Sequence, residues 1–216
     1  GDREMVWQRA LQRLRAARLL AEDEGNTGAL DAHPLVREHF EERLKSNDDA
    51  VPEGESSPYR EAHRRLYEHL KQSAPEQPDN LNDMMPLYHA VAHGCKAGLS
   101  EEVILDVYFR RTKRDAQQDF ANRKLGVPGL DLAATACFFE HPFREPSQNI
   151  SDRLKGAACN WASYGLRAVG RLREAIEPMN VGLVEAVRAN AWLDSAKQTS
   201  NLSELSLTLG DVSFAV

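Results

Sequence analysis

The sequence Gly170-Arg171-Leu172-Arg173-Glu174-Ala175 indicates a repeated structure, because its spacing returns in Gly210-Asp211-Val212-Ser213-Phe214-Ala215. In each stretch glycine comes first, an apolar residue follows two positions later, and alanine follows five positions later. Glycine reaches the left-handed conformation that ends a helix, and alanine lets the next helix approach closely. The glycines lie 40 residues apart (210 minus 170), so the pattern predicts a repeated pair of antiparallel helices.

A weaker copy begins at Gly98, 72 residues before Gly170 (170 minus 98), and one degenerate unit containing Leu130 to Phe139 fits between them. No comparable stretch alternates apolar and polar residues, so a large sheet is not expected. The sequence therefore predicts a mainly α fold. The expected helices are 4–17, 34–44, 59–72, 83–97, 100–120, 129–140, 151–169, 172–190 and 193–209.

The N-terminal part differs in character from the rest. Residues 18–21 and 29–32 favour two short strands around a glycine-bearing turn, and Pro34 favours the start of a helix. An acidic stretch with proline and serine then interrupts the chain. We expect a first domain over 1–46, a linker over 47–58 and helical repeats over 59–216.

Composition narrows the function classes. The 216 residues are 42% hydrophobic and 28% charged, and the formal net charge is -6, which gives no global attraction to nucleic acid or an anionic membrane. No apolar run approaches the roughly 20 residues that span a bilayer. Cys95, Cys137 and Cys159 lack CxxC spacing, which favours buried reduced thiols. We expect a cytoplasmic protein without a cofactor.

The helix pairs resemble tetratricopeptide repeats, which stack antiparallel helix pairs into a superhelix. Their usual period is about 34 residues, so a 40-residue step implies longer helices or connections. Small residues (Cys159, Ala162 and Ser163) stand where that family carries large ones. The resemblance implies an α-α superhelix with a protein or peptide ligand in its groove.

Four longer stretches resemble the junction in bacterial STAND-type signalling ATPases where a winged-helix domain leads into a tetratricopeptide sensor. They are residues 29–40, 59–70, 86–99 and 201–211. The resemblance implies a winged-helix remnant followed by repeats that bind a signal or partner and relieve inhibition of a nucleotide switch. No G-x-x-x-x-G-K-[ST] phosphate loop occurs in this chain, so we expect no ATP hydrolysis and no catalytic residue.

Aligning Gly170 with Gly210 predicts which side chains line the groove, because equivalent first helices place equivalent positions inward. Repeat superhelices bind extended segments there through side-chain amides and charges. The predicted groove residues are Asn160, Tyr164, Arg167, Ser200, Glu204 and Thr208, with Tyr88 and Lys96 as their counterparts in the weak first copy.

Two alternative functions stay open. The first helix carries Arg9, Arg13, Arg15 and Arg18, and winged helices bind DNA through such faces, although a solvated basic face is the simpler interpretation. His89 and His93 lie four apart, as zinc ligands do, with Cys95 or His69 able to complete a site. The residues between them are apolar, which favours packing or surface histidines. Trp161 and Trp192 are interpreted as core residues.

The C-terminal end predicts an unfinished repeat. Only six residues follow Gly210, and six residues are too few for the second helix of a pair. We therefore expect a chain truncated within a repeat, with Val212, Phe214 and Val216 exposed in one copy and the open end covered by another copy or a crystal neighbour. Burial of Leu205, Leu209 and Phe214 within one monomer would count against this expectation.

Overall fold

The computed structural model describes residues 2–20, 32–46, 57–115 and 118–214 and is mainly helical, as expected. The chain divides into two compact units, Gly1–Tyr59 and Arg60–Val216. Each unit is described by itself below. Most of the expected linker, 47–58, lies outside the described residues. In the described part of the chain, no helix combines the length and apolar character needed to cross a membrane.

In the described residues of the first unit, helices α1 and α2 bury few side chains. Helix α1 (Asp2–Ala16) is closed two residues after its end by Arg18, whose φ of 56° is left-handed, as that of a capping glycine would be. Leu20 and Ala32 form an antiparallel bridge where the ends of a hairpin are expected, and the rest of that hairpin lies outside the described residues. Helix α2 (Pro34–Ser46) starts at the expected proline, and none of its residues is buried.

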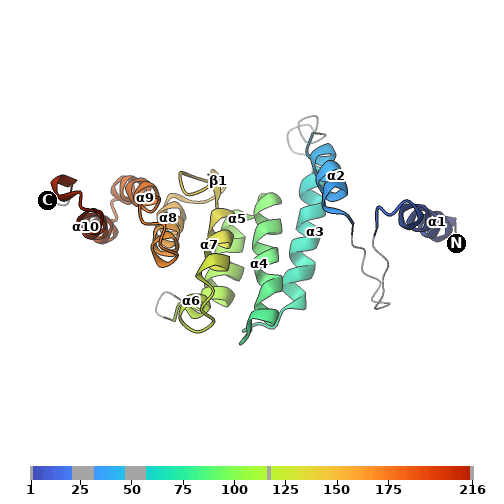
Figure 1. Ribbon diagram of the computed structural model, residues 1–216, viewed down its shortest axis with the longest axis horizontal. Helices are drawn as coiled ribbons and strands as arrows, with labels where there is room; N and C mark the ends of the chain where they lie inside the picture. Colours follow the sequence, from blue (N-terminus) through green and yellow to red (C-terminus); the bar gives the residue numbers. More distant parts are fainter. Residues whose placement is uncertain (1, 21–31, 47–56, 116–117, 215–216) are drawn as a thin grey trace. The chain divides into compact units, whose positions relative to one another are not determined.

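The second unit carries the remaining elements in chain order (Figure 1). They are α3 (Pro58–Ser73), which begins in the first unit, α4 (Leu81–Lys96), α5 (Ser100–Glu102), the π-helix η2 (Val103–Lys113), α6 (Phe120–Arg123), α7 (Pro128–Ala136), β1 (Phe139–His141), β2 (Glu145–Pro146), α8 (Asp152–Ala168), α9 (Ile176–Arg188), α10 (Trp192–Leu209) and the short 3-10 turn η3 (Val212–Phe214). Neighbours in the chain pack together: α4 on η2, α7 on α8, α8 on α9, and α9 on α10.

The glycine breaks are confirmed. Gly98, Gly170 and Gly210 have φ values of 80°, 79° and 84°, the left-handed conformation that ends a helix. At the end of α8, the Gly170 N–H donates to the Arg167 carbonyl (3.1 Å) and the next N–H to the Leu166 carbonyl (2.8 Å). Asn190, with a φ of 55°, ends α9 by the same pair of bonds, because asparagine is the next best residue for this conformation.

Two expected helices are wrong in part. The helix expected over 100–120 stops at Lys113, where Arg114 turns left-handed (φ 62°), and only Phe120–Arg123 becomes helical again. The helix expected over 129–140 stops at Ala136, and Phe139 pairs with Pro146 in a two-stranded antiparallel hairpin. The proline at 142 explains the second difference, because its missing N–H and the restricted residue before it oppose a helix.

Buried basic side chains explain why the helix expected over 100–120 stops at Lys113. Their hydrogen bonds hold the end of η2 in the interior of the protein. Arg111 is buried, and its guanidinium donates to carbonyl oxygens in the last turn of α3 and in the residues just after it. The acceptors are Lys71 (2.9 Å), Ala74 (2.9 Å), Pro75 (2.8 Å) and Glu76 (3.3 Å). Burial lowers the pKa of Arg111. These bonds satisfy carbonyls that a helix end leaves unpaired.

A second buried cation joins η2 to α6 and α7. The Lys113 ammonium donates to Asp119 (2.7 Å) and Asp131 (2.9 Å), and the Asn122 amide donates to the same two carboxylates at 3.0 Å. We call Lys113, Asp119, Asn122 and Asp131 the buried lysine network. A buried charge is tolerated only when it is paired in this way.

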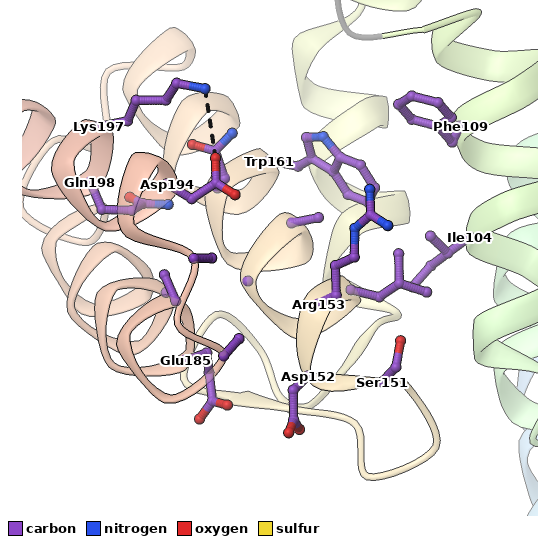
Figure 2. A pocket seen from close by; sticks show the side chains of 18 of the residues that line it. Ile104, Phe109, Ser151, Asp152, Arg153, Trp161, Glu185, Asp194, Lys197 and Gln198 are labelled. Carbon is purple, nitrogen blue, oxygen red and sulfur yellow. Dashed lines mark ion pairs between the residues drawn. The ribbon is translucent and has the colours of Figure 1, made fainter.

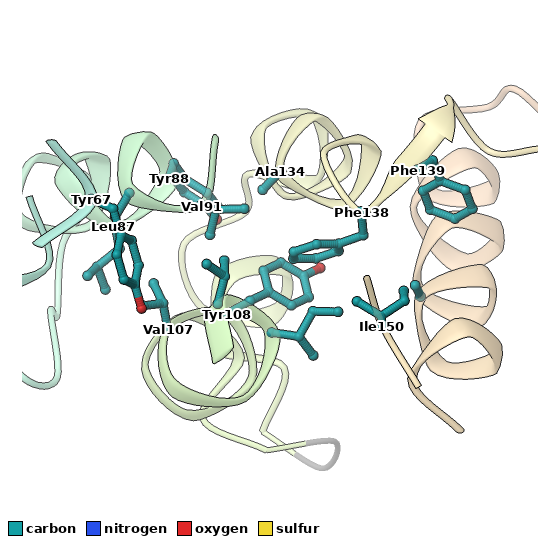
Figure 3. Packing of buried hydrophobic residues seen from close by; sticks show 14 of the residues in the cluster. Tyr67, Leu87, Tyr88, Val91, Val107, Tyr108, Ala134, Phe138, Phe139 and Ile150 are labelled. Carbon is teal, nitrogen blue, oxygen red and sulfur yellow. The ribbon is translucent and has the colours of Figure 1, made fainter. Parts of the chain in front are cut away.

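The main hydrophobic core lies among α3, α4, η2, α7 and α8 (Figure 3). Tyr67 and Tyr108 are fully buried in it, and Tyr108 contacts the ring of Phe138 edge-on at 5.2 Å between centroids. Its hydroxyl is 2.8 Å from Oγ1 of Thr135, so the polar tip is satisfied. A second cluster joins α7, α8, α9 and α10 through Leu132, Leu166, Ala175, Met179 and Leu205.

The second cluster corrects the expectation for the last helix. Leu205 is only 1% exposed and Leu209 is partly buried against the cluster, both within one copy of the chain. Leu207 and Val212 are exposed, as an uncovered end requires, whereas the side chain of Phe214 and residue Val216 lie outside the described part. Association with a second copy through this end stays a prediction.

Candidate functional site

A cleft of about 700 Å³ opens between η2, α8, α9 and α10 in the second unit (Figure 2). Its volume lies within the range of sites that hold ligands. We call it the α8–α10 cleft. Apolar side chains from two regions of the chain line it, namely Ile104, Leu105 and Phe109 of η2 with Ala157 and Trp161 of α8.

Trp161 provides the largest apolar surface of the α8–α10 cleft. Its ring lies 5.1 Å from the ring of Tyr108 and is stacked at 27° and 6.2 Å on Phe109, measured between centroids. Contacts with the buried Tyr108 and with Phe109, which also lines the cleft, therefore hold the indole in place, while its partly exposed remainder faces the cleft. A fixed aromatic surface of this kind can receive an apolar side chain without further ordering cost.

Gln198 of α10 is the most unusual polar group of the cleft. The residue is 5% exposed, its side chain makes no hydrogen bond within the described residues, and its Oε1 atom is fully buried. Gly182 of α9 makes room for it, because a Cβ at that position would lie 3.3 Å from Nε2 of Gln198. An unpaired buried amide costs about 1–3 kcal/mol, so a partner that enters with a ligand would relieve that cost.

Each carboxylate that lines the cleft already has a partner. Glu101 accepts from the N–H and the hydroxyl of Ser151 (both 3.1 Å), and three ion pairs engage the others: Asp152 with Lys155 (3.2 Å), Glu185 with Arg188 (2.9 Å) and Asp194 with Lys197 (3.6 Å). Arg153 and Asn160 of α8 are exposed, and neither makes a hydrogen bond or ion pair with any residue that the structure describes.

The predicted groove residues of α8 and α10 lie on and beside this cleft. Asn160 lines it, and Tyr164 is exposed one turn further along α8. Arg167 and Glu204 form an ion pair of 3.3 Å between the two helices. The N-terminal halves of α8 and α10 line the same cleft and their C-terminal halves are joined by this pair, so the helices run in the same direction. Ser200 and Thr208 are exposed on α10.

Tyr88 and Lys96, the expected counterparts in the first copy, do not join this surface. Tyr88 is 7% exposed and belongs to the main core, and Lys96 is exposed on α4. The reason is a phase error: η2 and α7 separate α4 from α8, whereas α9 alone separates α8 from α10. With alternating helices, α4 therefore falls out of phase with α8 and α10.

The histidines considered for a zinc site are not arranged as that hypothesis expects, with His89 and His93 as a pair of ligands. His93 has its Nδ1 atom 2.7 Å from Nδ1 of His63, and the two rings stack at 5.0 Å, while His89 and His69 are exposed. Within the described residues, no three His, Cys, Asp or Glu side chains gather closely enough to hold a metal ion.

Other sequence interpretations have mixed outcomes. Trp192, interpreted as a core residue, is 66% exposed, because it stands at the first position of α10 rather than on its inner face. Cys159 is fully buried as expected, and burial raises the pKa of its thiol to about 12. On α1, Arg9, Arg13 and Arg18 are exposed, and the exposed side chains of Met5, Val6 and Trp7 accompany them.

Sequence reasoning missed Arg153 and Gln198 as site residues. One signal was available for α8: Arg153, Ala157, Asn160 and Tyr164 fall on one helical face without a large aliphatic side chain. No comparable signal exists for Gln198, whose burial depends on the glycine at 182 in another helix. No family model matches this sequence, and no curated protein or solved structure matches it either.

Proposed function

We propose that the second unit is a non-catalytic binding segment that holds an extended segment of a peptide or protein in the α8–α10 cleft. The observation that carries the proposal is the buried amide of Gln198, which has no hydrogen-bond partner among the described residues and stands at the wall of an open cleft. The Nε2 group of this amide offers two donors, which match the C=O groups of an extended backbone.

The apolar lining supplies the remaining part of such a site. Trp161 and the exposed Leu105 offer surface for an apolar side chain, and Asn160 offers a second amide on α8. Amides that fix a backbone beside an apolar surface that receives side chains are the usual division of roles in a ligand site. This division of roles supports binding rather than chemistry as the use of the cleft.

The proposal extends to the arrangement and the parent protein. We infer that α8, α9 and α10 are part of a tetratricopeptide-like superhelix, supported by the parallel course of α8 and α10 and the glycine caps at 170 and 210. The resemblance in sequence supports a cytoplasmic sensor role in a signal-transduction ATPase of the STAND type. The gene sequence on either side of this segment tests the inference about the parent protein. We expect a phosphate loop upstream and further helix pairs downstream.

Peptide selection on the whole chain tests the binding function. The chain has three tryptophans, so a Trp7→Phe, Trp192→Phe variant leaves Trp161 as the sole fluorescent indole. We expect peptides enriched from a random library to shift Trp161 emission on titration. Filling the cleft by Ala157→Phe should abolish the shift, whereas Ala168→Phe on an exposed turn of α8 should preserve it.

Two results would overturn the proposal. One is the failure of any peptide to be enriched by the folded chain. The other is equal binding by the wild-type chain and the Ala157→Phe variant, with both folded as judged by circular dichroism.

A further inference from the structure

The wall that η2 contributes to the α8–α10 cleft is wound as a π-helix over Val103–Lys113. π-Helices are rare and usually extend over a single turn, so a run of this length needs a physical cause. Leu105 and Phe109 of η2 line the cleft, and the ring of Phe109 is stacked on Trp161. The winding of η2 therefore determines which of its side chains face a ligand.

Both ends of η2 are bonded to the same residue of α3. The Lys71 ammonium donates to the carboxylate of Glu102, the residue directly before η2 (3.1 Å), and the Lys71 carbonyl accepts from the Arg111 guanidinium (2.9 Å). The Tyr67 hydroxyl, one turn earlier on α3, also donates to Glu102 (2.9 Å). Glu102 and Arg111 therefore point toward the same side of η2.

An α-helix would place these two side chains on opposite sides. They are nine positions apart (111 minus 102), which is about two and a half turns of an α-helix. A π-helix forms hydrogen bonds to the fifth residue rather than the fourth, and its wider turn makes nine residues equal to about two complete turns. The two bonds with Lys71 therefore favour the π winding over the α winding.

We propose that α3 holds η2 in the π winding through Glu102 and Arg111 and thereby positions the cleft wall. Leu105 lies between the two contacts and is 48% exposed. Rewinding to an α-helix would turn the first half of η2 against its fixed end at Arg111, so Leu105 would leave the surface that it forms with Trp161. Glu102 does not line the cleft and acts as a positioning residue. The effect on peptide binding rests on the proposed function.

Glu102→Ala tests this proposal, because it removes the acceptor of both α3 donors at an exposed position and introduces a good helix former. NMR of the peptide-free chain should show that the first half of η2 loses its backbone contacts to the fifth residue. The emission of Trp161, in the Trp7→Phe, Trp192→Phe background, should shift at the same time. An enriched peptide should bind about fivefold more weakly.

Two variants serve as controls. Glu102→Gln keeps an oxygen that can accept from Tyr67 and Lys71, so it should preserve the winding, the Trp161 emission and the peptide affinity. Glu140→Ala removes an exposed carboxylate of β1 outside the cleft and should also leave all three unchanged.

Two results would overturn the inference. One is a Glu102→Ala chain that keeps the contacts to the fifth residue along η2. The other is a rewound η2 that leaves either the Trp161 emission or the affinity of an enriched peptide unchanged. If the folded wild-type chain enriches no peptide, the binding function fails, whereas the NMR contacts and the Trp161 emission still decide whether Glu102 positions the cleft wall.

Discussion

Lys113 and Gln198 are both buried polar side chains of the second unit, 3% and 5% exposed, but the protein around them treats them differently. Lys113 is held by two carboxylates at 2.7 and 2.9 Å, and a neighbouring amide bonds both of those carboxylates. The Gln198 side chain makes no hydrogen bond within the described residues and borders a cleft of about 700 Å³.

The comparison teaches how structural and functional polar groups can be told apart. Polar side chains in the buried lysine network bond one another, although one oxygen each of Asn122 and Asp131 is buried without a partner within the described residues. Removing any member therefore leaves a bonded neighbour unpaired. Removing Gln198 leaves none unpaired among the described residues. We therefore expect changes in the network to lower stability, and changes in the cleft to lower binding while stability is kept.

The largest expected effect is that of Lys113→Met. The change leaves two buried carboxylates without their cation, which should lower the unfolding free energy by about 3–5 kcal/mol. Urea denaturation followed by circular dichroism measures it. Lys124→Met, at an exposed position after α6, is the control and should stay within about 0.5 kcal/mol of wild type. A loss below about 1 kcal/mol for Lys113→Met would remove the distinction between the two regions.

Replacing one amide side chain in each region by leucine compares the buried lysine network with the α8–α10 cleft. Asn122→Leu removes an amide that bonds Asp119 and Asp131, and it should cost about 1–3 kcal/mol of unfolding free energy. Gln198→Leu removes an amide that makes no hydrogen bond within the described residues. The change should leave the unfolding free energy within about 1 kcal/mol of wild type or raise it. Equal losses for both variants in the same urea titration would show that Gln198 also has a structural role.

Two glycines beside the cleft provide a smaller test of its packing. In Gly182→Ala the new Cβ would lie 3.0 Å from Cβ of Cys159 and 3.3 Å from Nε2 of Gln198, so we expect a net loss of about 1 kcal/mol. Gly156→Ala meets nothing within 4 Å and should stabilise α8 by about 0.5–1 kcal/mol. Thermal unfolding of both variants measures the difference, and a stabilising Gly182→Ala would contradict the packing described around Gln198.

The smallest expected effect is a pH dependence at Glu102, a partly exposed group. Burial would raise the pKa of Glu102, but hydrogen bonds from Tyr67 (2.9 Å) and Lys71 (3.1 Å) outweigh it and hold that pKa below its usual value. A lowered folded-state pKa contributes stability above the unfolded value of 4.5 and loses it as the pH falls further. Solvent screening keeps the contribution below about 1 kcal/mol.

Urea titrations of wild type and Glu102→Gln at pH 7, 5, 4 and 3 test this effect. The wild-type advantage should be present at pH 7 and absent at pH 3. An advantage that persists at pH 3 would mean that the carboxylate is not what stabilises this contact.

The helix ends were the part of the fold that the sequence predicted best. Gly98, Gly170 and Gly210 end helices because few other residues adopt φ near 80°, so a local signal sufficed. The end of η2 at Lys113 was not predictable in this way, since it depends on carbonyls after α3 and on carboxylates of other elements. Periodicity assigned residues to helices but carried no information about these distant partners.

The candidate site was predictable only in its helical face. Asn160, which the alignment of Gly170 with Gly210 assigned to the groove, lines the cleft. Tyr88 was assigned to the groove from a weak repeat copy that is out of phase, and it is buried. In the sequence, Gln198 is an ordinary polar residue of an amphipathic helix. Only the structure shows that it is enclosed, through its contact with Gly182 of α9.

The most direct test of the central claim is the dissociation constant of an enriched peptide for the Gln198→Leu variant, measured by Trp161 fluorescence in the Trp7→Phe, Trp192→Phe background. The account predicts binding weakened by about tenfold or more, with the unfolding free energy within about 1 kcal/mol of the parent. An unchanged dissociation constant in a stably folded Gln198→Leu variant would contradict it.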